Sequence, residues 1–323
     1  MKRIKLQIIS LFLISILLFS GLSLGRSNNQ KFVILQENND FYFVQITDTH
    51  VMHKIFDRNE ISKNRLKIVL AHICSFDNKP AFIVITGDLT EWGGSWISGA
   101  LNCLAFTSCF YKKDNQFYAD ENYSIPIYTT PGNHDYNLNR NLGNYHRFIK
   151  NDERYIVNYS NVSLFFMNSG PNYYGDLYDW LHNIDGAGLY DYDIQWLESA
   201  LGNCSFNYRI VLMHHPAINS RVNNGEMHGV IARNREAFID LCEEYNVDLV
   251  LTGHTHNSKV FDSNEHYYDF NNSLNCSLYP TLFVQTDDCK EGIHYRNVSL
   301  IGNDIWIENS VELEFLNRFD SDT

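Results

Sequence analysis

The sequence has little positive charge. It carries 25 lysine and arginine residues against 38 aspartates and glutamates, which gives a formal net charge of −13 at pH 7 over 323 residues. This balance argues against a surface that binds long nucleic acid, so any affinity for phosphate must come from a local positive site. With only 6 prolines, 44% hydrophobic and 20% charged residues, the composition is globular and excludes a disordered or collagen-like chain.

Long apolar runs are also scarce, because only one approaches the thickness of a membrane. Residues 1–5 are basic, residues 6–24 are apolar, and Ser23 and Gly25 offer small residues at the −3 and −1 positions. This pattern predicts a signal peptide over residues 1–25 and a secreted or extracytoplasmic protein with no stable membrane insertion after cleavage. The alternative is an uncleaved anchor, since about 19 apolar residues nearly span a bilayer.

Cysteine occurs only seven times, and the odd number leaves at least one thiol unpaired within the chain. Cys276 and Cys289 flank an expected hairpin or loop and form the first candidate disulfide, and Cys103 with Cys109 forms a second. Export would make the Asn-x-Ser sequons candidate glycosylation sites. These sequons lie at Asn122, Asn158, Asn161, Asn203, Asn271, Asn275 and Asn297.

No proline-, glycine- or serine-rich linker and no internal repeat interrupts the chain, so residues 26–323 are expected to form a single domain. Short β-branched and aromatic runs predict strands, and apolar residues at helical spacing predict helices between them. The predicted strands are 41–46, 80–86, 125–129, 163–167, 208–213 and 247–252. The predicted helices are 64–76, 93–110, 193–201 and 234–245. This alternation favours an α/β architecture, whereas residues 257–323 favour strands, at 281–285, 294–300 and 304–308.

Five of the predicted strands are followed by polar segments of similar character. Because the carboxyl ends of strands in open α/β sheets converge on one crevice, these segments should meet at a single place. They are Thr47-Asp48-Thr49-His50, Gly87-Asp88-Leu89-Thr90-Glu91, Gly132-Asn133-His134-Asp135, His214-His215-Pro216 and Gly253-His254-Thr255-His256.

The spacing within the segments suits metal ions. In extended backbone, residues i and i+2 point to the same side, so Asp48 and His50 should present two ligands together. The His-x-His segment that ends at His256 should do the same, whereas the adjacent His214 and His215 should point in opposite directions. Imidazole, carboxylate and amide oxygen fit Zn, Mn or Fe. Seven such ligands and no cysteine favour two metals that share a carboxylate over one structural zinc ion.

In order and character, the five segments resemble the motifs of the calcineurin-like metallophosphoesterases over residues 41–256. The resemblance implies a four-layer αββα sandwich of two mixed β-sheets flanked by helices, with a dinuclear metal site at the strand ends. It also implies that Asp88 bridges the metals and that His134 contacts the phosphate. The implied ligands are Asp48, His50, Asp88 and His256 for one metal and Asp88, Asn133, His214 and His254 for the other.

Departures from the family's subgroups narrow the expected activity. Glu91-Trp92 and Asp135 replace the residues of protein Ser/Thr phosphatases, and Glu91 also replaces the tyrosine ligand of purple acid phosphatases. The Asp-x-His and His-His-Pro segments are more similar to class III cyclic-nucleotide and glycerophosphodiester phosphodiesterases. We therefore expect hydrolysis of small phosphodiesters or nucleotides. The alternatives are a phosphomonoesterase for phosphate scavenging and, more distantly, a sphingomyelinase-like phosphodiesterase. A non-catalytic binding module is disfavoured, because every motif is present.

The expected chemistry follows from the two metals. They would lower the pKa of a bridging water from about 16 to about 7, so that hydroxide attacks the phosphorus of a small phosphate ester. His134 would act as general acid or phosphate contact, and Asp135 or Glu91 would orient it or a ligand histidine. His215 is expected to be a packing or rim residue. Residues 92–96, 172–180 and 219–228 are candidate walls of the substrate pocket.

Overall fold

The computed structural model describes residues 40–136, 141–171, 188–220, 222–223, 226–227 and 229–314, with the backbone alone at 222–223 and 226–227. The predicted signal peptide lies outside these residues, as do the candidate wall 172–180 and residues 221, 224, 225 and 228 of the candidate wall 219–228. Among the helices within the described ranges, none has both the length and the apolar character that a membrane crossing needs.

The first β-sheet is mixed and has parallel strands at its centre. β1, β2 and β5 run parallel, and the C-terminal hairpin of β15 and β16 adds to them because β15 pairs antiparallel with β1. In spatial order the strands are β13 (Ser273–Asn275), β16 (Asp304–Glu308), β15 (His294–Ile301), β1 (Phe41–Ile46), β2 (Ile83–Thr86), β5 (Pro126–Thr130), β4 (Gln116–Tyr118) and β3 (Tyr111–Lys113), and β17 (Val311–Glu312) pairs with β15.

The second sheet is also mixed. β7, β8, β11 and β14 run parallel, and antiparallel strands close both edges. Its strands are, in order, β12 (Lys259–Asp262), β14 (Leu282–Gln285), β11 (Leu249–Thr252), β8 (Tyr208–Leu212), β7 (Val162–Phe166) and β6 (Tyr155–Tyr159). A separate two-stranded ribbon consists of β9 (Val222–Asn223) and β10 (Glu226–Met227).

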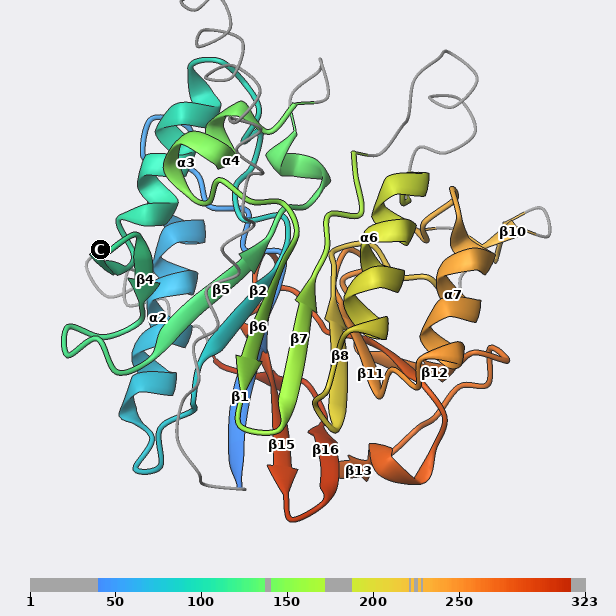
Figure 1. Ribbon diagram of the computed structural model, residues 1–323. Helices are drawn as coiled ribbons and strands as arrows, with labels where there is room; N and C mark the ends of the chain where they lie inside the picture. The colour runs from blue at the N-terminus through green and yellow to red at the C-terminus, as the bar shows by residue number, and fades with distance from the viewer. Residues whose placement is uncertain are drawn as a thin grey trace, which may run out of the picture. The chain divides into compact units, whose positions relative to one another are not determined.

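Helices cover the outer faces of both sheets (Figure 1). The first sheet carries α2 (Ile61–Ser75), α3 (Ser98–Thr107) and α4 (Gly143–Phe148), and the second carries α6 (Asp191–Gly202) and α7 (Arg235–Glu244). Two 3-10 turns, η1 (Asn133–Asp135) and η2 (Cys276–Leu278), complete the described elements.

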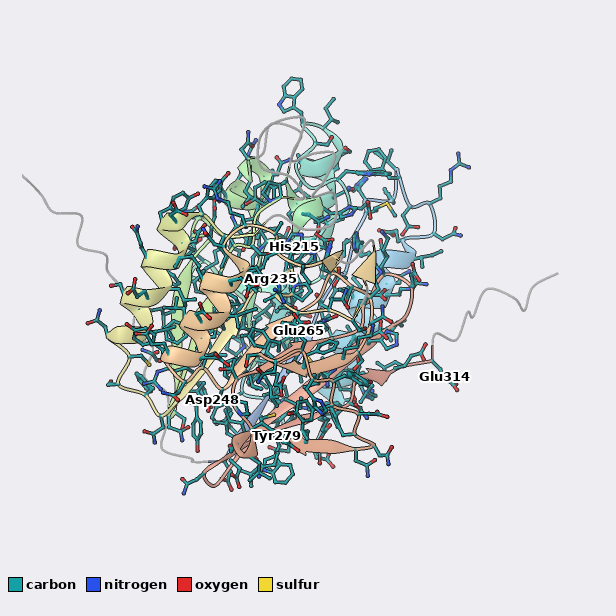
Figure 2. The ribbon with its side chains drawn as sticks, turned by 90° about the vertical axis from the view of Figure 1, so that its right-hand side faces the viewer. His215, Arg235, Asp248, Glu265, Tyr279 and Glu314 are labelled. Carbon is teal, nitrogen blue, oxygen red and sulfur yellow. The ribbon has the colours of Figure 1, made fainter. Side chains whose placement is uncertain are left out.

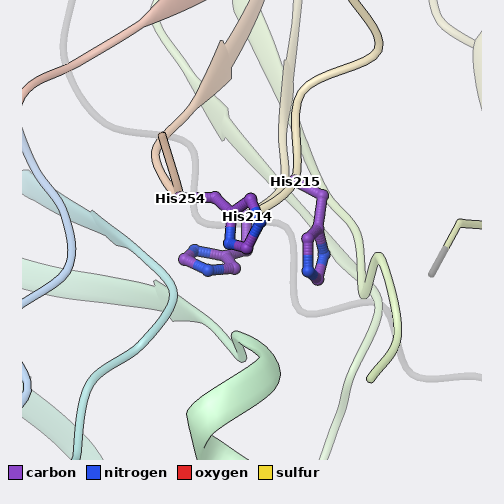
Figure 3. A group of neighbouring side chains, drawn as sticks. All are labelled: His214, His215 and His254. Atoms are coloured by element: carbon purple, nitrogen blue, oxygen red, sulfur yellow. The ribbon is translucent and has the colours of Figure 1, made fainter. Parts of the chain in front are cut away.

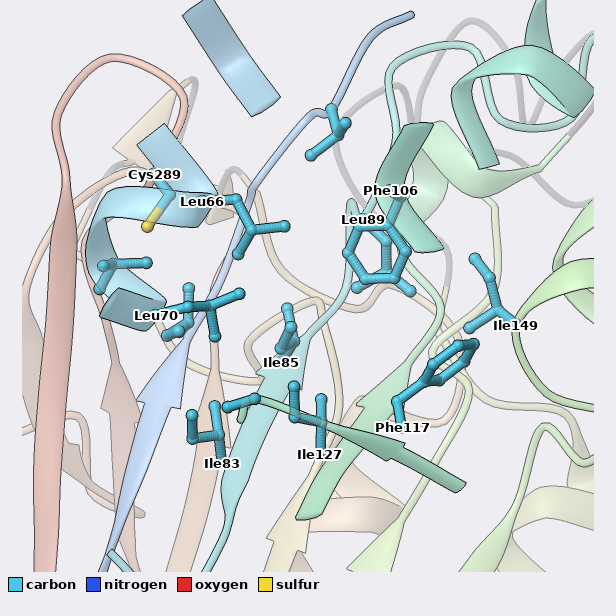
Figure 4. Close-up of a cluster of buried hydrophobic side chains, with 14 of the residues drawn as sticks. Leu66, Leu70, Ile83, Ile85, Leu89, Phe106, Phe117, Ile127, Ile149 and Cys289 are labelled. Carbon is cyan, nitrogen blue, oxygen red and sulfur yellow. The ribbon is translucent and has the colours of Figure 1, made fainter. Parts of the chain in front are cut away.

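Three separate clusters of buried apolar side chains define the layers. One packs α2 and α3 against the first sheet, with Leu66 and Leu70 of α2 lying over Ile83 and Ile85 of β2 (Figure 4). A second cluster lies between the two sheets, and a third packs α6 and α7 against the second sheet. Helix, sheet, sheet and helix therefore follow one another, which confirms the four-layer α/β sandwich.

The strands and helices predicted from sequence all occur; 41–46 and 304–308 have the predicted bounds, and the others have shifted ends. Leu66, Val69, Leu70 and Ile73 form the buried face of α2, as their spacing indicates. Burial of each such side chain stabilises the fold by roughly 1.5–3 kcal/mol. The strands and the helix that periodicity missed are short or lie at sheet edges: β3, β4, β6, β9, β10, β12, β13, β17 and α4.

The predicted disulfides are wrong, because all seven cysteines are free thiols. Cys276 packs between the two sheets, whereas Cys289 packs under α2 on the opposite face of the first sheet. Cys103 lies within α3 and is buried, and Cys109 follows the end of the same helix. The first sheet thus separates Cys276 from Cys289. Cys103 and Cys109 are held apart by the helical backbone of α3 between them.

Polar side chains join the two sheets directly beneath the strand ends. Gln45 of β1 is fully buried, and its Nε2 donates to Thr86 Oγ1 of β2 (2.9 Å) and to the Thr252 carbonyl of β11 (3.0 Å). Its Oε1 accepts from Thr286 Oγ1 (2.7 Å), which in turn accepts from Arg296 Nε of β15 (2.9 Å). Because Thr86 and Thr252 immediately precede two of the polar segments, this network fixes the offset between those segments.

Candidate metal centre

The predicted polar segments meet where the strands of both sheets end. The first sheet supplies the segments after β1, β2 and β5, and the second supplies those after β8 and β11. The local backbone is not extended, however, because Asp48, His50, Asp88, His254 and His256 all have positive φ, between 40° and 66°. The left-handed turn, not strand alternation, therefore brings each pair of ligands to one side, in a conformation that is uncommon for residues other than glycine.

Asp88 lies at the centre of the site and is almost completely buried. Its Oδ2 is 3.4 Å from His50 Nε2 and 3.3 Å from His214 Nε2. Its Oδ1 accepts the backbone N–H of His134 at 2.8 Å. One carboxylate oxygen thus reaches histidines that belong to both of the expected ligand sets.

Asp48 gathers the first ligand set. Its Oδ1 lies 3.4 Å from His256 Nε2 and 3.8 Å from His50 Nε2. Its Oδ2 is held by the His254 backbone N–H (2.9 Å) and by Thr47 Oγ1 (2.7 Å). The carboxylate is therefore fixed with one oxygen facing the imidazoles.

The second set forms around His214. Its Nδ1 lies 2.9 Å from the Thr86 carbonyl, which leaves Nε2 to face Asn133 Oδ1 at 3.0 Å. The ring of His254 lies beside it, with centroids 5.1 Å apart (Figure 3). The structure therefore brings together all seven residues predicted as ligands.

His215 corrects one expectation. Its ring does not point away from His214, since the two centroids are 4.9 Å apart in an edge-to-face arrangement. Its Nδ1 lies 2.8 Å from Ser169 Oγ, and the side chain is completely buried, so it is a packing residue and not part of the rim. Burial lowers the pKa of His215 well below its ordinary value, helped by the neighbouring His254 and His214, so the ring stays neutral.

The loop that follows this histidine pair is held from the second sheet's outer layer. Arg235, at the start of α7, donates from Nε to the Ala217 carbonyl at 2.6 Å and from Nη2 to Glu265 Oε1 at 3.0 Å. Figure 2 shows Arg235 between His215 and Glu265. These contacts anchor the backbone three residues after His214.

Glycines of the segments allow the close packing of the centre. Gly87 has φ of 87°, and a Cβ there would lie 2.4 Å from His214 Nδ1. A Cβ on Gly253 would lie 1.9 Å from Thr47 Oγ1 and 2.4 Å from Asp48 Oδ2. Any larger residue at these two positions would displace a proposed ligand.

Glu91 is a second carboxylate that organises the site. It is buried, with Oε2 accepting from His50 Nδ1 at 2.7 Å and Oε1 accepting from His134 Nδ1 at 2.8 Å. Lys290 Nζ lies 3.3 Å from Oε2. Glu91 therefore contacts a proposed ligand and the proposed phosphate contact at once, as expected of a residue that orients both.

Asp135 has a different role from the one expected. Its carboxylate accepts backbone N–H groups of Leu89, Thr90 and Gly132 at 2.9–3.1 Å and does not contact the His134 ring. Burial raises its pKa to about 6. It ties the loop after β2 to the loop after β5 and so holds Asp88 near Asn133.

The ionisation of the histidines is governed by the carboxylates. Burial alone would disfavour a charged His50, but Asp48 and Glu91 raise its pKa to about 10. Burial of His214 is likewise outweighed by Asp88 and Asp48, which raise its pKa to about 9. Because a metal binds neutral imidazole, metal binding would release these protons.

The chemistry of the site fits metal ions. Asp48 Oδ1 and His50 Nε2 are buried, and neither has a hydrogen-bond partner among the described residues. A buried polar atom without a partner costs about 1–3 kcal/mol, so such an arrangement is expected where a ligand completes it. The ligand atoms of Asp48, His50 and His256, and those of Asp48, Asp88 and His214, lie within 4.8 Å of one another. Imidazole nitrogen and carboxylate oxygen are ligands that Zn, Mn and Fe share.

The sequence pattern of the calcineurin-like phosphoesterases matches residues 41–258, which is more than half of the chain. The chain belongs to this family. Among curated relatives of this phosphoesterase, the probable glycerophosphodiester phosphodiesterase GpdQ of Arcobacter nitrofigilis is 26% identical over 221 residues, which cover 66% of this chain and 71% of that protein.

Two solved structures share the fold of the phosphoesterase. The purple acid phosphatase from yellow lupin (Lupinus luteus) seeds has a TM-score of 0.55 and 13% identity over 84% of this chain. The match covers 51% of that enzyme, so the chain spans about half its length. GAP50, the anchor in the inner membrane complex of Plasmodium, has a TM-score of 0.51 and 13% identity over 85% of this chain and 89% of its own.

Membership of the family makes the protein a phosphoester hydrolase, and the family uses a dinuclear metal centre. Sequence reasoning did not single out Lys290 or Asp288, which reach the site from the loop between β14 and β15. Asp288 Oδ2 lies 3.7 Å from His256 Nδ1. No pattern marks these residues, because their loop follows the last recognised segment by about thirty positions and approaches only through the fold.

Substitution of Glu91 by glutamine should lower turnover about 10–100-fold, the usual cost of losing an outer partner of a ligand histidine. The amide keeps one acceptor oxygen but turns an N–H₂ group toward one of the two imidazole N–H groups. Metal content at several metal concentrations and turnover together would measure the loss. Glu121→Gln, an exposed matched control, should behave as wild type. Full activity and metal affinity in Glu91→Gln would contradict the orienting role.

Proposed function

We propose that this phosphoesterase hydrolyses phosphodiesters of small molecules or nucleotides with two transition metals, Mn, Zn or Fe, at the candidate centre. The observation that carries the proposal is the position of Asp88 Oδ2, 3.4 Å from His50 Nε2 and 3.3 Å from His214 Nε2. A carboxylate oxygen in that position suits a bridge between two metals. The similarity to GpdQ, which is described as a probable glycerophosphodiester phosphodiesterase, favours a diester.

Each proposed metal takes ligands from both sheets. The proposed ligands are Asp48, His50, Asp88 and His256 for the first metal, and Asp88, Asn133, His214 and His254 for the second. Two such metals supply positive charge to the phosphate oxygens and acidify water.

His134 is the proposed general acid that protonates the leaving group. Its Nδ1 is held by Glu91, so Nε2 is the nitrogen available to substrate, and about a third of the side chain is exposed. The Nε2–H donates its proton to the departing oxygen as the P–O bond breaks, and the Glu91 carboxylate stabilises the imidazolium before that transfer.

Paired hydrolysis of bis-p-nitrophenyl phosphate and p-nitrophenyl phosphate tests the proposal. Chelator-stripped protein should be inactive, and reconstitution with Mn, Zn or Fe should restore turnover of the diester. Turnover confined to the monoester would replace the phosphodiesterase with a scavenging phosphatase. If two metals bound and neither ester were cleaved, the assignment of the centre to small diesters would fail.

We also propose that residues 1–25 are removed during export. The mature protein recovered from the medium of a secretion-competent host should begin at Arg26, as measured by intact mass. Recovery of the full-length chain in the membrane fraction would support the anchor instead.

Among the sequons, Asn158 is buried and its Oδ1 accepts from Ser163 Oγ at 2.7 Å, so no glycan is expected there.

A further inference from the structure

Large apolar side chains are exposed together on two adjacent loops, residues 53–58 before α2 and residues 92–97 before α3, which we name the docking loops. Phe56 and Trp92 bring the loops into contact, edge to face, with ring centroids 6.4 Å apart. The exposed fractions are 63% for Ile55, 39% for Phe56, 53% for Trp92, 91% for Trp96 and 68% for Ile97.

The docking loops are held in place by the side-chain amides of a buried and a half-buried asparagine. Asn102 of α3 accepts the His53 backbone N–H at 2.9 Å and donates to the Glu91 carbonyl. Asn144 of α4 donates to the Gly93 carbonyl at 2.8 Å. The loop backbones are thus tied to the helical layer while their apolar side chains face outward.

The docking loops border the candidate metal centre. Trp92 directly follows Glu91, whose side chain binds His50 and His134. The Gly93 backbone N–H donates to the His134 carbonyl at 2.7 Å. A molecule that lies against the docking loops is therefore next to the proposed phosphate contact.

The charge of the docking loops differs from that of the rest of the chain. Lys54 and Arg58 are exposed. Asp57, the one acid in these fully described segments, is buried and accepts the N–H and O–H groups of Ser62. Within residues 53–58 and 92–97, a chain with a net charge of −13 thus exposes apolar and basic side chains and no carboxylate. The nearby Glu60, whose side chain is 39% exposed, is paired with Lys63 at 3.2 Å.

Apolar side chains beside basic ones match the surface of an anionic lipid layer. Tryptophan favours the boundary between headgroups and acyl chains, and lysine and arginine are attracted to anionic headgroups. A second copy of the chain is a poorer occupant, because a two-fold contact would bring the basic residues of both copies together.

We propose that the docking loops seat the enzyme on lipid surfaces that contain anionic lipid, and that its substrates include phosphodiesters of amphiphiles. The headgroup phosphate enters the centre while the apolar part stays in the lipid. The proposal that the substrates are amphiphiles rests on the proposed function, whereas the proposal of a lipid contact does not.

Co-sedimentation of the mature chain, which begins at Arg26 and lacks the apolar run 6–24, with vesicles tests the contact. The vesicles are phosphatidylcholine alone or mixed with phosphatidylglycerol, and the wild type should bind the mixed vesicles more tightly. The Trp96→Ser, Ile97→Ser double variant should partition at least about tenfold more weakly. Lys54→Gln and Arg58→Gln should each weaken binding to the mixed vesicles roughly fivefold. This loss should be smaller at high salt, because salt screens the attraction between the basic side chains and the anionic headgroups.

The matched control is Leu278→Ser. Leu278 is 75% exposed and precedes Tyr279, which lies at the end of the molecule away from His215 (Figure 2). Its vesicle binding should equal that of the wild type, and thermal melting of every variant checks the fold. Failure of the wild type to bind vesicles, or unchanged binding by the double variant, overturns the inference. A wild-type dimer that the double variant converts to a monomer also overturns it, in favour of a second copy.

The two proposals can fail separately. Vesicle binding without turnover of bis-p-nitrophenyl phosphate would overturn the proposed function and leave the lipid contact standing. Turnover of bis-p-nitrophenyl phosphate without vesicle binding would overturn the lipid contact and leave the proposed function standing. Wild-type hydrolysis of a lysophospholipid headgroup diester, faster in micelles than below the micelle concentration, would support both.

Discussion

Asp88→Asn should reduce phosphodiester turnover by at least about a thousandfold, or 4 kcal/mol in transition-state stabilisation. Oδ2 of Asp88 is the atom placed within 3.4 Å of both His50 and His214. Asparagine keeps the shape and can keep the acceptor for the His134 N–H, but it removes the negative charge that would hold two cations together. Metal content, measured by atomic absorption after gel filtration, should fall below two per chain.

Asp269→Asn, an exposed aspartate, is the matched control and should retain both metals and full turnover. Two tightly bound metals and wild-type turnover in Asp88→Asn would rule out the bridging assignment. Unchanged metal content with lost turnover would restrict the role of Asp88 to catalysis.

His134→Gln should leave both metals bound and lower turnover about 10²–10⁴-fold, the range of a lost general acid. The loss should be larger for a glycerophosphodiester with an alkoxide leaving group than for bis-p-nitrophenyl phosphate. A p-nitrophenolate leaves without help from a proton, whereas an alkoxide does not.

His266→Gln, on the exposed loop after β12, is the control for histidine removal and should be indistinguishable from wild type. An equal loss for both leaving groups would make His134 a phosphate contact and not a proton donor. No loss for either substrate would remove it from the reaction altogether.

Local patterns were sufficient to predict much of the fold. The run 41–46 is β1 to the residue, and the apolar faces of α2 and α7 are the ones that helical spacing indicated. These elements are specified by contacts that repeat every two, three or four residues. β3 and β4 are three-residue strands at one end of the first sheet, too short to show any period.

The site was predicted as a set of residues but not as a geometry. Strand alternation was the wrong reason for the nearness of Asp48 and His50, because the chain turns into left-handed backbone as soon as β1 ends. The double contact of Glu91 was also beyond sequence reasoning, since its partners lie 41 and 43 positions away. Such contacts depend on how loops from different strands approach one another, which no local period records.

The Gln45 network has a consequence for the spacing of the two proposed metals. Three polar segments come from one sheet and two from the other, and Gln45 fixes their offset through Thr86 and Thr252. A slip of one sheet along the other would therefore alter the intermetal distance without any change in the ligands. The distance between the two ions would therefore report the relative position of the two sheets, and the buried Gln45 amide would determine that distance without contacting either ion.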